Sequence, residues 1–161
     1  MNDEVILVSA CLLGVNTRYD GGNAYCPEVV DDLFNRHFIP VCPEQLGGLP
    51  TPRLPSNIQG GDGWEVWRGC ARVVNKAGED VTAAFLKGAK EVLGIAQMAR
   101  VARAILKDHS PSCGCRLIYR GEELIAGAGV TAALLAENGF KVVSELGEPL
   151  FPKGGKGIND F

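Results

Sequence analysis

Four short runs of aliphatic and β-branched residues recur along the chain, and they constrain its fold more than any other feature. The runs are VILVSA (Val5–Ala10), FIPVC (Phe38–Cys42), VARAILK (Val101–Lys107) and KVVSE (Lys141–Glu145). Short apolar runs rich in Val and Ile predict buried β-strands. Because segments with helical periodicity separate them, the pattern predicts an α/β fold with a mostly parallel sheet flanked by helices.

Three segments between these runs are predicted to be helical. In CPEVVDDLFNRHF, Pro27 suits the first turn of a helix and the apolar residues fall on one face. Apolar residues recur at helical spacing from Asp80 to about Met98, and VTAALLAENGF ends on the stop signal Asn138–Gly139. These helices would cover the predicted sheet.

The remaining segments are predicted to be loops and hairpins. Residues 43–63 are rich in Pro and Gly, so we expect a long loop there. WEVWRGCARVVNKAGEDV and LIYRGEELIAGAG each alternate around a glycine-containing turn, which predicts two β-hairpins. We expect a single domain over residues 1–161, with an irregular tail from about residue 146.

Composition and charge restrict the classes of function. The chain has 161 residues, 16 Lys and Arg against 19 Asp and Glu, and a formal charge of −3. This balance argues against general nucleic-acid binding, which normally requires a basic patch. The start, MNDEVILVSACLLG, is acidic and its apolar stretch is short, so we expect neither a secretory signal nor a membrane span. The sequence predicts a cytoplasmic protein, whose thiols would be reduced; it indicates no oligomeric state.

Three of the six cysteines stand where a predicted strand ends. Cys11 follows the first strand, Cys42 ends the second, and Cys113, in HSPSCGC, follows the third. Because the carboxyl ends of parallel strands meet at one edge of a sheet, we expect these three thiols to converge. Disulfide, metal or cluster ligand, and nucleophilic thiol are the three chemistries open to them.

The spacing favours one kind of metal site. Thiolates select zinc, copper(I) and iron–sulfur clusters, but the C-x₂-C pair of a structural zinc site is missing, and Cys113 and Cys115 are too close together to form one. Widely spaced cysteines suit an iron–sulfur cluster, and three ligands would leave one iron open. Free cysteine is also a common core residue, so burial without chemistry is the alternative. We assign Cys26, Cys70 and Cys115 to that structural class.

The motifs SACLLGVNTRYDGG, VCPEQLGGLPTPR and DHSPSCG resemble those of a small bacterial family of iron–sulfur desulfidases, formerly a domain of unknown function, that includes thiouracil desulfidase. The likeness spans nearly the whole chain. It implies a [4Fe-4S] cluster held by Cys11, Cys42 and Cys113, whose fourth iron is free to take sulfur from the substrate. It also implies that Glu44 and Ser110 are catalytic. The family often has a cysteine before RYDG where this chain has Thr17; that cysteine is not among the implied ligands.

The resemblance implies a non-redox desulfidase that removes sulfur from a thiolated nucleobase or a related small thiocarbonyl compound, for example thiouracil to uracil plus hydrogen sulfide. A sulfide-carrying or binding protein without hydrolytic activity is the alternative, and it would have no use for Glu44. A structural zinc domain is a third. Arg18, Asp20 and Arg53 are candidate substrate contacts, with salt bridging between loops as their alternative role. His109 could shuttle protons or hydrogen-bond its own turn.

Overall fold

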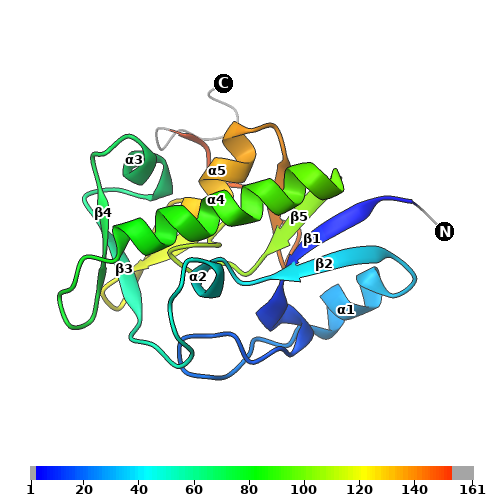
Figure 1. Ribbon diagram of the computed structural model, residues 1–161, viewed down its shortest axis with the longest axis horizontal. Coiled ribbons are helices and arrows are strands. Elements are labelled where there is room, and N and C mark those ends of the chain that lie inside the picture. The colour runs from blue at the N-terminus through cyan, green and yellow to red at the C-terminus, as the bar shows by residue number, and fades with distance from the viewer. Residues whose placement is uncertain (1–2, 154–161) are drawn as a thin grey trace.

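The computed structural model of the chain describes residues 3–153. Its central sheet has four parallel strands in the order β2-β1-β5-β8 (Figure 1). They are β1 (Val5–Ser9), β2 (His37–Val41), β5 (Arg103–Leu106) and β8 (Lys141–Ser144). All four predicted strands are present, and the α/β fold with a parallel sheet flanked by helices is confirmed.

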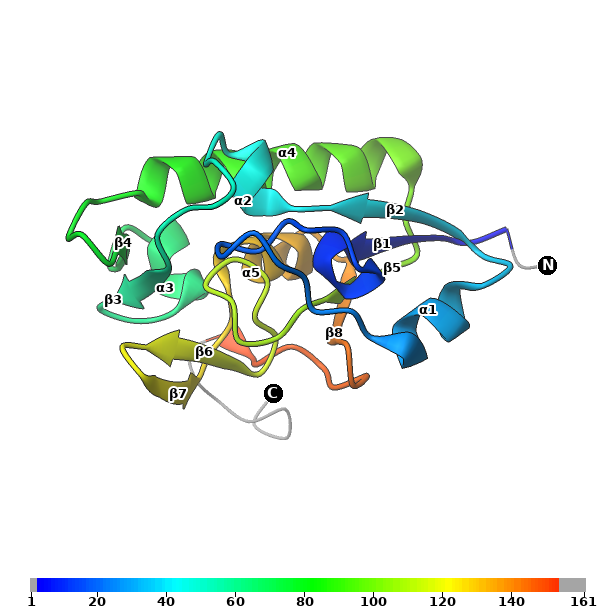
Figure 2. The same cartoon turned by 90° about the horizontal axis from the view of Figure 1, so that it is seen from below.

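Helices cover both faces of this sheet (Figures 1 and 2). The long helix α4 (Thr82–Ala99) and α5 (Val130–Glu137) cover one face, and α1 (Pro27–Leu33) covers the other. Side chains alternate accordingly: Leu7 packs into the cluster with α4 and α5, whereas Ile6 packs against α1. A strand that is buried on both faces reads as a continuous apolar run, which is why VILVS was recognisable in the sequence.

Smaller elements extend the carboxyl edge of the sheet. The 3₁₀ helix η1 (Ala10–Leu13) follows β1, and the short helix α2 (Pro43–Leu46) follows β2. The hairpin of β6 (Leu117–Arg120) and β7 (Glu123–Ala126) lies beyond β5, as predicted. These additions surround the edge at which the predicted thiols stand.

Two predictions about the middle of the chain were wrong in part. Residues 43–63 are not one long loop, because they contain α2 and a strand, β3 (Ser56–Gln59). The next segment begins with α3 (Gly63–Trp67) and continues with β4 (Arg72–Asn75), which pairs antiparallel with β3. Its second half does turn back on itself, through an antiparallel bridge between Val74 and Asp80.

A helix cap explains the second error. The Asp62 carboxylate accepts the Trp64 N–H at 3.0 Å, and the Glu65 carboxylate accepts the Asp62 N–H at 3.4 Å. This capping box starts α3 where the aromatic alternation suggested a strand. The Trp64 and Trp67 indoles donate to the backbone carbonyls of Phe151 and Val130, so both rings anchor α3 to its neighbours.

The end of the chain is only partly described. The structure covers the first part of the predicted irregular tail, where β8 is followed by a turn and an isolated bridge between Val143 and Pro149. The rest of that prediction, over residues 154–161, lies outside the described residues. Within residues 3–153, no helix has both the length and the apolar character needed to cross a membrane.

Helix α2 is held against α4 by direct backbone contact. A Cβ atom at Gly88 of α4 would collide with the Pro43 carbonyl of α2, and one at Gly47 would collide with the Ala84 carbonyl. Only glycine permits this approach. The position of α2, and of the residues it carries, therefore depends on the absence of a side chain at Gly47 and Gly88.

We expect Gly88→Ala to lower the free energy of unfolding by about 1–3 kcal/mol, because α2 must move to admit the methyl group. Gly94, in the same helix, has open space around its Cβ position and is the matched control. Gly94→Ala should instead raise stability by about 0.5–1 kcal/mol through helix propensity alone. Urea denaturation measures both, and equal stabilities of the two variants would contradict the packing argument.

Candidate active site

The ends of three adjacent strands open into one cavity of about 720 Å³, which the Cys11, Cys42 and Cys113 side chains help to line. Cys11 lies in η1 after β1, and Cys42 is the residue that precedes α2 after β2. Cys113 lies in the loop after β5. The thiols are far apart in sequence, and the parallel order β2-β1-β5 brings them together at one edge, as predicted.

The three thiols affect one another's pKa values. The pKa of Cys11 is raised to about 11, mainly by burial and also by the neighbouring Cys42, whereas Lys107 opposes the shift. Burial also raises the pKa of Cys113; the Ser9 hydroxyl opposes this, and both Cys42 and Cys11 add to it. A positively charged partner that replaced the thiol proton would stabilise the thiolate form of each of these two cysteines.

The other three cysteines lie elsewhere, and none of them lines the cavity. Cys115 is fully buried in the core beside α4 and α5, and Cys26 precedes α1. Cys70 is exposed. All six side chains are free thiols, so the structure contains no disulfide among them.

Glu44 enters the cavity from the first turn of α2. Its Oε1 accepts a hydrogen bond from Arg53 Nε at 3.0 Å, in an ion pair whose side chains are 16% and 5% exposed respectively. Arg53 also donates from Nη2 to the Thr17 carbonyl at 2.9 Å and from Nη1 to Thr51 Oγ1 at 3.0 Å. The same Nη2 lies 4.0 Å from Cys42 Sγ. The Arg53 guanidinium therefore connects Glu44 and Cys42 with the loops that contain Thr17 and Thr51.

Ser110 shapes the loop that carries Cys113. Its Oγ accepts the N–H groups of Ser112 at 3.0 Å and Cys113 at 2.9 Å. The first N–H groups of α5 also hold this loop: Val130 donates to the Pro111 carbonyl and Thr131 to the Ser112 carbonyl, each at 2.8 Å. The N–H groups at the amino end of α5, which have no acceptor within the helix, are thus hydrogen-bonded to the loop that carries Cys113. The Ser110 hydroxyl proton is not used in either bond and is available to a ligand.

The candidate substrate residues are placed differently from one another. Arg18 lines the cavity, with its guanidinium 5.7 Å from the centre of the Tyr19 ring. Asp20 does not line it; its carboxylate accepts the Gly22 N–H in an exposed turn. His109 lines the cavity and meets the Tyr119 ring edge-on, with 5.9 Å between ring centres.

Two lining residues, Ser9 and Lys107, had not been recognised from the sequence. Ser9 is buried beside Cys113, and its Oγ accepts the Lys107 N–H at 2.9 Å. Lys107 Nζ pairs with Glu145 Oε2 at 3.1 Å and places a positive charge near Cys11. Ser9 is the last but one residue of a predicted strand and Lys107 is the last residue of another, and this position is the signal that could have identified them.

The donor set fits an iron–sulfur cluster. Three thiols, the softest ligands a protein offers, face one cavity and none of them is tied up in a disulfide. Among residues 3–153, no three His, Cys, Asp or Glu side chains are grouped as ligands of a single metal ion. Three thiols that share a cavity without forming a site for a single ion suit a polynuclear centre better than one zinc ion.

Comparison with known proteins gives three matches. The model of the 2-thiouracil desulfurase family matches residues 6–146. The "Uncharacterized protein YbbK" of Bacillus subtilis (strain 168) is 43% identical over 144 residues, which cover 88% of this chain and 95% of that protein. A solved structure of the [4Fe-4S]-dependent thiouracil desulfidase TudS is similar with a TM-score of 0.77 and 42% identity, covering 88% of this chain and 91% of that one.

We expect Arg53→Lys to lower the free energy of unfolding by about 2–3 kcal/mol, because an ammonium group cannot replace the buried donors of the guanidinium fork. Arg103→Lys is the matched control, since Arg103 pairs with Asp32 at 3.2 Å in an exposed position. It should cost less than about 1 kcal/mol. Urea denaturation compares the two variants, and similar losses would refute a special role for Arg53.

Proposed function

The chain belongs to the 2-thiouracil desulfurase family, and we propose that it is a [4Fe-4S]-dependent desulfidase that removes sulfur from a thiolated nucleobase or a related small thiocarbonyl compound. The observation that carries the proposal is the convergence of Cys11, Cys42 and Cys113 on one cavity that Glu44 and Ser110 also line. In the overall reaction water replaces sulfur on carbon: a C–O bond forms, the C–S bond breaks, and hydrogen sulfide leaves without net electron transfer.

We assign the three converging cysteines as the ligands of the cluster. Three protein thiolates would leave one iron without a protein ligand. When bound, the cluster supplies a thiophilic Lewis acid that attracts the thiocarbonyl sulfur and withdraws electron density from its carbon. Lys107, held near Cys11 by Glu145, adds positive charge to a site that gathers thiolates.

Glu44 is proposed as the general base. Arg53 holds its Oε1, which leaves Oε2 to take a proton from the water that attacks the substrate carbon. The ion pair also fixes the carboxylate against the wall that carries Cys42. A base held by its neighbours needs little reorganisation when the substrate arrives.

Ser110 is proposed to orient the substrate. Two backbone N–H groups occupy its oxygen, so its own proton is directed to another acceptor, such as a ring nitrogen or the carbonyl oxygen that forms. Arg18, on the cavity wall, is proposed as a further substrate contact. The volume of about 720 Å³ is in the usual range for small-molecule sites.

We propose a reducing compartment, the cytoplasm, as the place of action, and a small molecule as the only partner that the site requires. The free state of all six cysteines supports the first point. The net charge of −3 supports the absence of general nucleic-acid binding.

Replacing any one of the three proposed ligands with serine should remove most of the iron bound after anaerobic reconstitution, because a hydroxyl is a poor ligand for this centre. Iron analysis and electron paramagnetic resonance of the reduced protein measure the loss. Cys70→Ser is the matched control, since this exposed thiol lies away from the cavity, and it should bind iron as the natural protein does. Full loading of Cys42→Ser would exclude the assignment.

Glu44→Gln should keep the cluster but lower kcat for sulfide release by about 10²–10⁴-fold, because the amide can still accept from Arg53 yet cannot take a proton. Sulfide release from 2-thiouracil and from other thionucleobases is measured beside the iron content of each preparation. Undiminished release by a fully loaded Glu44→Gln protein would favour the sulfide-carrier alternative instead.

A further inference from the structure

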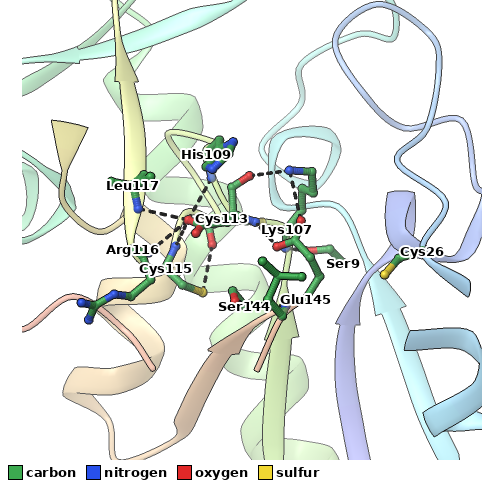
Figure 3. Close-up of polar contacts among 12 residues, drawn as sticks. Ser9, Cys26, Lys107, His109, Cys113, Cys115, Arg116, Leu117, Ser144 and Glu145 are labelled. Carbon is green, nitrogen blue, oxygen red and sulfur yellow. Dashed lines mark hydrogen bonds and ion pairs between the residues drawn. The ribbon is translucent and has the colours of Figure 1, made fainter. Parts of the chain in front are cut away.

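One carboxylate oxygen holds the loop that carries Cys113. Asp108 Oδ1 accepts four backbone N–H groups. Figure 3 labels the four residues that donate them, His109, Cys115, Arg116 and Leu117. The donors and their distances are His109 at 2.9 Å, Cys115 at 2.8 Å, Arg116 at 3.0 Å and Leu117 at 3.2 Å. The bonds close residues 108–117, the cysteine loop, onto its own first residue.

The cysteine loop needs such a fastening because part of its backbone is strained. His109 has a φ of +77°, a conformation that non-glycine residues rarely adopt and that costs on the order of 1–2 kcal/mol. The His109 N–H nevertheless reaches both Asp108 Oδ1 and the Leu117 carbonyl. Strain of this kind persists only where the surroundings determine it strongly. The Asp108 carboxylate is one of the groups that do so here, and with four bonds it makes the most contacts to the loop backbone.

A second set of bonds ties Asp108 to the end of β8. Its own N–H donates to Glu145 Oε1 at 2.8 Å, and its carbonyl accepts from Lys107 Nζ at 2.8 Å. Lys107 and Glu145 pair with each other at 3.1 Å. Hydrogen bonds therefore hold both the backbone and the side chain of Asp108 in place. Because the cysteine loop is bonded to this side chain, the loop is restrained as well.

The bond between Asp108 and the Cys115 N–H lies close to two thiols, those of Cys113 and Cys115. Cys115 is fully buried in the core, where its Sγ donates to the Cys113 carbonyl at 3.6 Å. Cys113, two residues earlier, lines the cavity. Both carry the same thiol, so only the path of the backbone decides which of them faces the cavity.

We propose that Asp108 is a positioning residue of the active site, whose carboxylate sets the path of the cysteine loop so that Cys113 faces the cavity and Cys115 faces the core. The inference rests on the proposed function in assigning Cys113 as a cluster ligand. It adds that hydrogen bonds within the chain itself hold this ligand in place.

The charge of Asp108 suits this role. Burial raises the pKa of its carboxyl group, but the backbone N–H groups of Arg116, Leu117, Cys115 and His109 more than offset that, so the pKa lies below its ordinary value. The ionised form is the one that accepts four donors. An amide of the same shape is uncharged, and its oxygen is a weaker acceptor for these four donors.

Asp108→Asn tests the proposal, with Asp62→Asn as the matched control. Asp62 and Asp108 are 7% and 9% exposed, and the Asp62 carboxylate also accepts backbone N–H groups, those of Trp64 and Ala128, each at 3.0 Å. Asp62 does not line the cavity. Both variants remove a buried, hydrogen-bonded carboxylate, but only Asp108→Asn should disturb the thiols.

Two measurements read out the thiols directly. In the metal-free protein, alkylation mapped by mass spectrometry should label Cys115 about tenfold faster in Asp108→Asn than in the natural protein or in Asp62→Asn. After reconstitution, Asp108→Asn should lose iron to a chelator about 10–100-fold faster, as expected when a group that orients a ligand is removed. Thermal unfolding shows how far each variant is destabilised.

Alkylation and iron retention unchanged from the natural protein, with a stability loss like that of Asp62→Asn, would overturn the proposal. If Asp108→Asn alone does not fold, the double variant Asp108→Asn/His109→Gly gives the same two measurements, because glycine adopts a positive φ without strain. Failure of the natural protein to bind any cluster would refute the proposed function. The alkylation of Cys115 would then still decide the role of Asp108.

Discussion

The parallel pairing of β2, β1 and β5 is the constraint on which the rest of this molecule depends. Parallel strands point their carboxyl ends the same way, so whatever follows each strand is delivered to one edge of the sheet. Here each of the three strands is followed by a thiol that lines the same cavity. An antiparallel arrangement of the same strands would have separated the thiols by the length of a strand.

Thiols and carboxylates lose hydration when they are buried at the edge of the sheet. Nearby charged side chains and backbone N–H groups offset this cost. Glu44 is paired with Arg53, Lys107 with Glu145, and Asp108 with a set of backbone N–H groups. Among the described residues, no buried side-chain nitrogen or oxygen lacks a hydrogen-bond partner. Such complete pairing makes the walls of the site rigid, since moving any one group would leave another unsatisfied.

The walls are also joined backbone to backbone. Gly88 lets α2, with Glu44, lie directly on α4, and Gly129 brings the start of α5 against the cysteine loop, where a Cβ would collide with the Ser112 carbonyl. Contacts of this kind leave little freedom for side-chain repacking. They connect the long helix of the core to the chemistry at the sheet edge, so that stability and site geometry depend on the same few positions.

The sequence by itself determined the four strands, the main helices and the edge at which Cys11, Cys42 and Cys113 meet, because apolar runs are local properties and helices between strands favour parallel pairing. The order of the strands, β2-β1-β5-β8, came only from the tertiary structure. The sequence predicted a strand where α3 forms, because the capping box of Asp62 and Glu65 outweighs the alternation of aromatic residues there. The sequence also assigned Cys113 to the site and Cys115 to the structural class, but only the tertiary structure shows the contacts that hold the two thiols apart. These contacts depend on Asp108 and on Glu145, which lies 37 residues further along the chain and meets Asp108 only after β5 and β8 have paired.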